Sequence, residues 1–207
     1  MNPTDPTHPT RPAPGAAAET LHPRAIVRFP EQAQLAAELL RKPPALLGLS
    51  DADARCVVGF MQLLDYPKGA TLLREHDRVA TGYMLLVLSG EVSVETAEPG
   101  DSGRGDAVAI SVLGAGSLLG EMALLDGEPR STECTALSPV QCAGLSRQGL
   151  DQLLALHPQV AAKLLAEVAS IIANRLRALS DQLRLYGRLT ASMQGEIDRL
   201  KARAAGR

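Results

Sequence analysis

The residues in this sequence that are best suited to bind a ligand lie in one short stretch, residues 120–132 (GEMALLDGEPRST). It opens with Gly120, which lets a ligand approach the backbone closely, and continues as helix formers that end at an Asp-Gly pair. The start of a helix presents free N–H groups and the positive end of the helix dipole, which favour an anion. Arg130 and Ser131 follow the turn and can add a charged fork and a neutral donor. The stretch therefore predicts an anion site.

Glu121 is an unusual neighbour for an anion because its carboxylate carries the same sign of charge. Its position is explained if the carboxylate accepts hydrogen bonds from a sugar hydroxyl instead of facing the anion. Thr132 follows Ser131 at the end of the stretch. The combination indicates a ligand that carries both a negative group and a sugar.

Other kinds of reactive site have little support. The four histidines show no metal-ligand spacing, and no Ser or Cys stands in a nucleophile motif with a companion histidine, so we expect no enzyme activity and no metal. Cys56, Cys134 and Cys142 are odd in number and widely spaced, which fits neither a disulfide framework nor a zinc site. We expect Cys134 and Cys142 in the core, a reducing compartment, and redox sensing only as a distant alternative.

Length and composition restrict the class of protein. The 207 residues suit one domain with extensions, and 45% hydrophobic residues are enough to form a core. The net charge of −2 and the pI near 6.1 lack the basic footprint of a dedicated nucleic-acid binder. The sequence has neither a secretory signal pattern nor an apolar run of ~18 residues. We therefore expect a cytoplasmic protein without membrane attachment.

The elements that must position the candidate residues follow from local patterns. Residues 1–30 hold seven of the fourteen prolines and predict a disordered tail rich in Pro, Thr and Ala. Helices are expected over 31–41 and about 51–63, the second capped by Ser50 and Asp53. From 65 to 146 short apolar runs alternate with Gly-rich turns, which predicts an antiparallel sandwich or barrel, with 98–106 as an exposed hairpin tip.

A long helix is predicted from Pro158. Two apolar stripes run along it: a shorter one that can cover the β-domain, and a heptad seam that can meet a second copy. The alternative is that both stripes bury within one monomer. Gly187 and Gly195 each cost ~1 kcal/mol in a helix, so a break or fraying is expected after Tyr186. The shorter stripe is Val160, Leu164, Val168 and Ile171; the heptad seam is Leu165, Ala169, Ile172, Leu176, Leu179, Leu183, Tyr186, Thr190, Met193, Ile197 and Leu200.

Residues 120–132 resemble the phosphate-binding cassette of the cyclic nucleotide-binding domains of catabolite-activator-type regulators, protein-kinase regulatory subunits and nucleotide-gated channels. The resemblance covers about 50–186, because DYPKGATLLREHD, YMLLVLSGEVSV and LGAGSLLGEMALLDGEPRST follow in the family's order. It implies an α+β fold: an antiparallel β-roll (double-stranded β-helix or jelly roll) flanked by helices, with a long C-terminal dimerisation helix. The expected domains are the tail 1–30, a cyclic nucleotide-binding β-roll with N-terminal helices over 31–157, and a coiled-coil helix over 158–207.

The resemblance also implies roles for individual residues. Glu121 would bind the ribose 2′-OH, Arg130 the cyclic phosphate, and Ser131 would add a phosphate hydrogen bond. Where the family frequently has Gly-Asp, this chain has His76-Asp77; where catabolite-activator-type proteins meet the purine with a Thr-Ser pair, it has Arg175 and Leu176. The candidate ligand-binding residues are Gly120, Glu121, Met122, Ala123, Arg130, Ser131, Thr132 and Arg175.

The expected ligand is a cyclic nucleotide, with cyclic AMP preferred and cyclic GMP or a cyclic dinucleotide as alternatives; no other cofactor is expected. The expected assembly is a parallel homodimer through residues 158–200 that signals to an unidentified downstream protein. Only 21 residues follow Tyr186, too few for a helix-turn-helix domain, so we expect no direct sequence-specific DNA binding. The competing hypothesis is a ligand-free dimerisation scaffold of the same fold.

Overall fold

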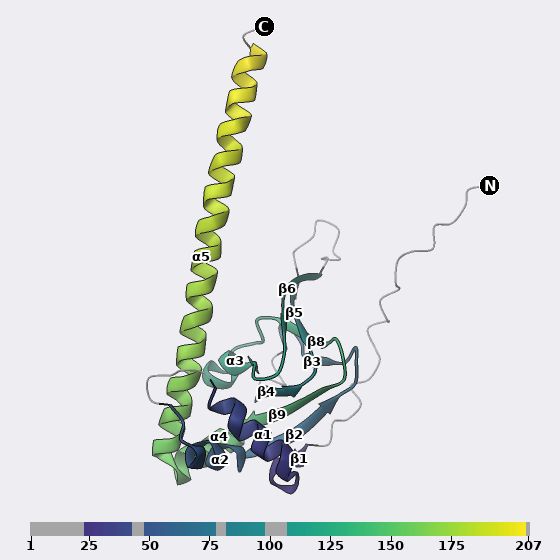
Figure 1. The fold of residues 1–207 in the computed structure, drawn as a ribbon, viewed down its shortest axis with the longest axis vertical. Helices are drawn as coiled ribbons and strands as arrows, with labels where there is room; N and C mark the ends of the chain where they lie inside the picture. Colours follow the sequence, from purple (N-terminus) through teal and green to yellow (C-terminus); the bar gives the residue numbers. More distant parts are fainter. Residues whose placement is uncertain (1–22, 43–47, 78–81, 98–106, 206–207) are drawn as a thin grey trace, which may run out of the picture.

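The computed structural model describes residues 23–42, 48–77, 82–97 and 107–205. Two antiparallel sheets lie at its centre, and their strand orders are β1-β2-β9-β4-β7 and β3-β8-β5-β6 (Figure 1). The first sheet consists of β1 (Arg24–Ala25), β2 (Met61–Tyr66), β9 (Val140–Ser146), β4 (Tyr83–Ser89) and β7 (Leu118–Leu119). The second consists of β3 (Thr71–Leu73), β8 (Glu133–Ala136), β5 (Val92–Ala97) and β6 (Ala107–Leu113). The expected antiparallel β-roll with flanking helices and a long C-terminal helix is confirmed.

The strand β4 shows how one sheet serves two cores. Successive side chains of a strand point to opposite faces, and this strand is apolar at nearly every position because both faces are buried. Met84, Leu86 and Leu88 pack in the core beneath the helices. Leu85 and Val87 pack between the two sheets. One face of the sheet therefore packs against the helices, and the other face packs against the second sheet.

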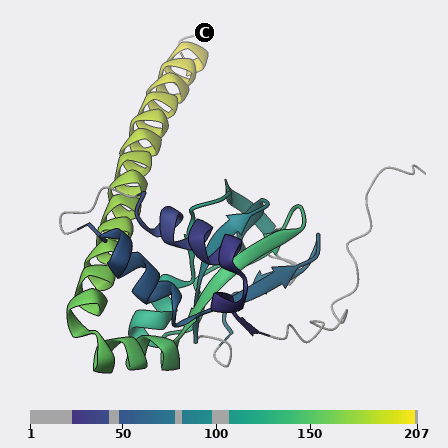
Figure 2. The same ribbon diagram turned by 60° about the horizontal axis from the view of Figure 1, so that its bottom comes forward.

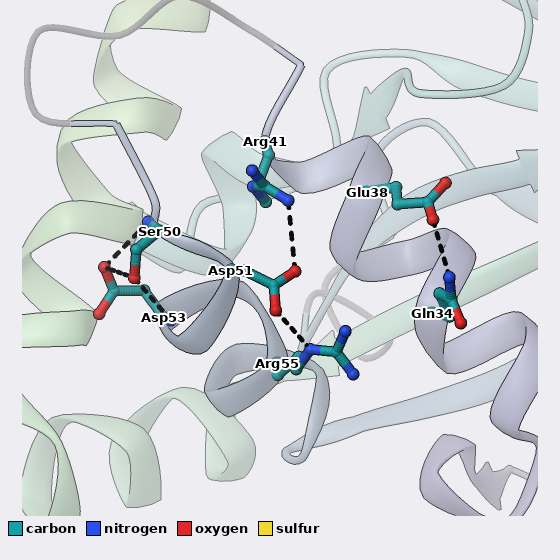
Figure 3. Close-up of polar contacts among 7 residues, drawn as sticks. All are labelled: Gln34, Glu38, Arg41, Ser50, Asp51, Asp53 and Arg55. Carbon is teal, nitrogen blue, oxygen red and sulfur yellow. Dashed lines mark hydrogen bonds and ion pairs between the residues drawn. The ribbon is translucent and has the colours of Figure 1, made fainter.

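The helical layer consists of α1 (Pro30–Leu40), α2 (Asp51–Val58), α4 (Arg147–Leu156) and α5 (Pro158–Ala205). Figure 2 shows α1 and α2 next to the first turns of α5. The predicted capping box is confirmed, because the Ser50 hydroxyl accepts from the Asp53 N–H and the Asp53 carboxylate accepts from the Ser50 N–H (Figure 3). The Asp51 carboxylate forms ion pairs with Arg41 (Nη1 to Oδ1, 3.2 Å) and with Arg55 (Nε to Oδ2, 2.7 Å). The pair with Arg41 connects the end of α1 with α2.

An ion pair attaches α5 to this layer. Lys163 Nζ lies 2.6 Å from Asp53 Oδ2, so the third residue of α2, which takes part in the capping box, also contacts the second turn of α5. The hydrogen bond from Lys163 and those from Ser50 lower the pKa of Asp53 to about 2. The contact joins α2 to the N-terminal part of the long helix.

Two local expectations differ from the structure. Part of the expected tail is folded, because Arg24–Ala25 pairs with β2 and the following 3-10 turn buries Ile26 completely; residues 1–22 and the expected hairpin tip lie outside the described residues. The helix expected over 51–63 ends at Val58, and Met61 already begins β2. Pairing of β2 with β9 overrides the local helical pattern there.

The helix α5 begins at Pro158 and continues through Gly187 and Gly195 to Ala205, so the expected break after Tyr186 does not occur. Its shorter stripe packs on the domain, as predicted, with Leu164 and Val168 buried. Figure 1 shows its C-terminal half extending past the β-roll. Six residues of the heptad seam are 42–70% exposed: Leu176, Leu179, Leu183, Tyr186, Met193 and Ile197. None of the helices in the described part of the chain is both long and apolar enough to cross a bilayer.

A buried carboxylate lies where α5 meets the sheet. Glu167 is 4% exposed, its Oε2 has no hydrogen-bond partner among the described residues, and it borders a cavity of about 20 Å³ lined by apolar side chains such as Leu86 and Leu118. Burial raises the pKa of Glu167, since the charged form loses its hydration. The α5 interface therefore contains one group that opposes packing when it is ionised.

We expect Glu167→Gln to stabilise the protein at neutral pH. The ordinary pKa of a glutamate side chain is 4.5. As the pH rises above this value, Glu167 loses its proton in the unfolded chain before it does so in the folded protein. The free energy of unfolding therefore decreases until the pH has passed the raised pKa of the folded state. The amide has no charge to desolvate and escapes this loss. Thermal denaturation should show a higher Tm for the variant at neutral pH and a shrinking difference toward and below pH 4.5. A variant that is less stable than the parent at neutral pH would contradict the expectation.

Candidate functional site

The candidate stretch is organised by a left-handed turn at Gly120. This residue has φ +71° and connects β7 with α3 (Glu121–Asp126), a short helix that ends at Gly127, also left-handed. A Cβ at position 120 would collide with the Arg130 guanidinium and lie 3.1 Å from the Leu73 side chain. Glycine is needed here both for its backbone conformation and for the close approach of Arg130.

Arg130 is 4% exposed, so the positive charge lies inside the protein. Its Nη1 donates to the Gly120 carbonyl at 2.6 Å and its Nη2 to the Tyr83 carbonyl at 2.7 Å. The turn at His76-Asp77 holds the Arg130 backbone, because His76 N–H donates to Arg130 O and Arg130 N–H donates to Asp77 O. Burial lowers the pKa of Arg130, yet a guanidinium keeps its proton in proteins. The site therefore holds a fixed cation beside the Gly120 turn.

The His76-Asp77 departure from the family pattern does not remove this turn. His76 has φ +62°, the left-handed conformation in which the family often has glycine, and its side chain is exposed as expected. The turn keeps its contact with Arg130 through backbone atoms. This substitution therefore leaves the position of the cation intact.

Glu121 supplies the opposite charge. It is the first residue of α3 and is 3% exposed. Its Oε1 forms an ion pair with Arg175 Nη1, and Arg175 Nη2 donates to the Leu118 carbonyl at 2.5 Å. The expected site residue on the long helix is thus joined to the expected ribose-binding residue, and Figure 1 shows α3 next to α5.

The other predicted residues take different positions around the turn. Ala123 is buried, whereas Met122 is 49% exposed and Ser131 is exposed. Thr132 is half-buried, and burial raises the pKa of the nearby Cys134 thiol to about 11. Cys134 is confirmed as a core residue, and so is Cys142 at 0% exposed.

Sequence reasoning missed the carbonyl groups of Tyr83, Leu118 and Gly120, which hold the two arginines. Every residue carries a carbonyl, so no side-chain pattern could have identified these three.

In the described part of the chain, no group of three or more His, Cys, Asp or Glu side chains is placed to hold a metal ion.

Residues 63–157 match the family model described as "Cyclic nucleotide-binding domain". A crystal structure of a cyclic nucleotide-binding domain from Methylobacillus flagellatus KT shares 34% sequence identity and superposes with a TM-score of 0.66, covering 73% of this chain and 82% of that one. The chain belongs to the cyclic nucleotide-binding domain family. The expected family is thereby confirmed.

Two curated relatives match over 146 residues, which are 70% of this chain. The "Cyclic AMP receptor protein" of Thermus thermophilus is 30% identical and matches over 63% of its length. The "CRP-like cAMP-activated global transcriptional regulator" of Mycobacterium tuberculosis is 24% identical and matches over 61% of its length. The chain thus spans about three fifths of these relatives, whose names describe regulatory or ligand-binding proteins.

We expect Gly120→Ala to destabilise the protein more than Gly127→Ala. Both glycines have left-handed backbones, so each substitution costs about 1–2 kcal/mol in conformation. At Gly120 the new Cβ also displaces the Arg130 guanidinium, whereas the atom nearest to a Cβ at Gly127 is an Arg147 nitrogen at 3.9 Å. Urea denaturation measures both losses. Equal losses for the two variants would contradict the close packing at Gly120.

Proposed function

We propose that this protein is a cyclic nucleotide sensor that acts as a regulator and not as an enzyme, with cyclic AMP as its preferred ligand. The observation that carries the proposal is the pair of buried opposite charges at the Gly120 turn, Glu121 at 3% and Arg130 at 4% exposed. Burying charge is costly and contributes little to stability. A cyclic nucleotide would use both groups, the guanidinium for the phosphate and the carboxylate for a ribose hydroxyl.

The choice of ligand rests on two supports. Arg130 is oriented by two carbonyl oxygens, so its charge is fixed before any anion arrives. The two curated relatives described above are named for cyclic AMP. Cyclic GMP and a cyclic dinucleotide remain alternatives at the same residues, with Gly120, Met122, Ala123, Ser131 and Thr132 lining the phosphate end.

The sensor acts as a parallel homodimer through residues 158–200. The exposed heptad seam supports this assembly, because apolar side chains at seven-residue spacing bury each other in a coiled coil. With Leu176 and Leu179 at its two apolar positions, Glu196 and Lys201 fall at flanking positions that face each other between parallel copies. Their opposite charges favour the parallel orientation.

The output of the dimer goes to a downstream protein. The proposed boundary between the β-roll unit and the coiled-coil helix lies at 157/158, where α5 begins. The sensor works in the cytoplasm, a reducing compartment in which Cys56, Cys134 and Cys142 remain free thiols.

We expect Arg130→Ala to lose most of the affinity for cyclic AMP. A hydrogen bond to a charged group contributes about 1.5–3 kcal/mol, so Kd should rise roughly ten- to a hundredfold. Isothermal titration calorimetry measures the change, and circular dichroism checks that the variant is folded. Arg130→Lys, which keeps the charge but loses the fork, should give an intermediate Kd.

The matched control is Arg55→Ala, because Arg55 is paired with Asp51 on α2. This variant should bind like the parent. Unchanged binding by Arg130→Ala would contradict the phosphate assignment. Thermal denaturation tests the scaffold hypothesis: specific binding stabilises the folded state by about 2.7 kcal/mol at a hundredfold excess over Kd, whereas a ligand-free scaffold is not stabilised by any cyclic nucleotide.

We expect the double variant Leu176→Glu/Leu179→Glu to be monomeric, because it places like charges where the heptad seam would bury apolar side chains. Light scattering at micromolar concentration measures the mass. The control is Leu185→Glu, since Leu185 is 56% exposed on the same helix but lies off the heptad seam. A parent protein that is itself monomeric would contradict the homodimer.

A further inference from the structure

We propose that Arg175 is a latch on the nucleotide site: in the ligand-free protein its guanidinium occupies the carboxylate of Glu121, and a nucleotide must take Glu121 over from it. The inference rests on the proposed function, which assigns Glu121 to the ribose. It adds that the site is closed from within by the same helix that carries the heptad seam. Ligand binding and the attachment of α5 then compete for one carboxylate.

The contacts of Arg175 close the site from both sides of the Gly120 turn. Nη1 pairs with the Glu121 carboxylate after the turn, and Nη2 donates to the Leu118 carbonyl before it, at 2.5 Å. The two bonds use both ends of the guanidinium fork. A single α5 side chain therefore spans the loop in which the ligand would be held.

The two partners of this ion pair differ in exposure, because Arg175 is partly in solvent and Glu121 is buried. Exposed ion pairs contribute almost nothing to stability, but a buried carboxylate without a partner is strongly unfavourable. The Glu121 side chain is 3% exposed, whereas the Arg175 side chain is 43% exposed. Arg175 can therefore leave into solvent, while Glu121 needs a new partner when it does. A ribose hydroxyl is a partner of the required kind, since it donates a hydrogen bond to a carboxylate.

Arg175 lies at the position where α5 separates from the domain. Ile171 and Ile172 are half-buried against the core, but Asn174 and Leu176 are exposed. Beyond this point Arg177 and Arg184 make their contacts within the helix, to Asn174 and Asp181. Release of Arg175 would free the part of α5 in which the exposed heptad seam begins.

The latch and the role that alignment with the family suggests for position 175 predict opposite changes in ligand affinity when Arg175 is removed. If Arg175 touched the base, its removal would weaken binding. If Arg175 competes with the ribose, its removal leaves Glu121 without its ion-pair partner in the ligand-free protein and so favours the ligand. The measurement of one affinity separates these two roles.

The test is calorimetric titration of cyclic AMP into the full chain and three variants. Arg175→Ala and Arg175→Gln should bind more tightly than the parent, by at least about fivefold, the lower end of typical coupling between sites. Arg177→Ala is the matched control and should bind like the parent, because Arg177 contacts only its own helix neighbour among its described hydrogen bonds. Equal or weaker binding by both Arg175 variants would overturn the latch.

A second ligand tests whether the competition takes place at Glu121. The 2′-deoxy analogue of cyclic AMP lacks the hydroxyl that would replace Arg175 on the carboxylate. The increase in affinity of Arg175→Ala over the parent should therefore largely disappear with this analogue. An equal gain with both ligands would mean that Arg175 blocks the site in another way and would overturn the competition at Glu121.

Failure of the latch can be told apart from failure of the proposed function. If the parent binds cyclic AMP and neither Arg175 variant binds it more tightly, the latch is wrong and the sensor function stands. If neither the parent nor any variant binds a cyclic nucleotide, both the sensor function and the latch are wrong.

Discussion

The buried guanidinium of Arg130 is the contact on which the rest of the site depends. It joins the Gly120 turn to the start of β4 through two carbonyl oxygens, while its own backbone pairs with the His76-Asp77 turn. The His76-Asp77 turn, Tyr83 and the Gly120 turn therefore meet around the charge of Arg130. The left-handed glycine is the physical condition for this arrangement, because any Cβ at position 120 would occupy the space of the guanidinium.

The long helix is held to this framework by few polar groups, and they are not equally favourable. Lys163 pairs with Asp53 near the start of α5, and Arg175 pairs with Glu121 where the helix leaves the domain. Between them Glu167 places a desolvated carboxylate against an apolar cavity, which opposes packing. The polar contacts of α5 therefore differ in their effect: two ion pairs attach the helix, and the desolvated carboxylate opposes its packing.

A ligand shifts a regulator between two states only by as much as its affinities for those states differ. The proposed latch would act through α5: its first turns pack in the core, Arg175 contacts Glu121, and its C-terminal half carries exposed apolar side chains. These three features lie in order along one helix. Release of Arg175, as proposed, would therefore act directly on the part of α5 in which the exposed heptad seam begins.

Patterns along the chain were enough to predict the antiparallel strands over 65–146, the Ser50-Asp53 capping box and the start of α5 at Pro158, because each rests on local spacing or a local motif. The β-roll and the roles of Glu121 and Arg130 came from the resemblance to the family. The two-residue β1 and the early end of α2 at Val58 were missed, because both depend on strand pairing with distant residues. The glycines at 187 and 195 do not break α5; a cost of ~1 kcal/mol each is small within a helix of 48 residues. The ion pair between Arg175 and Glu121 joins residues 54 positions apart, and only the packing of α5 beside β7 and α3 brings them together.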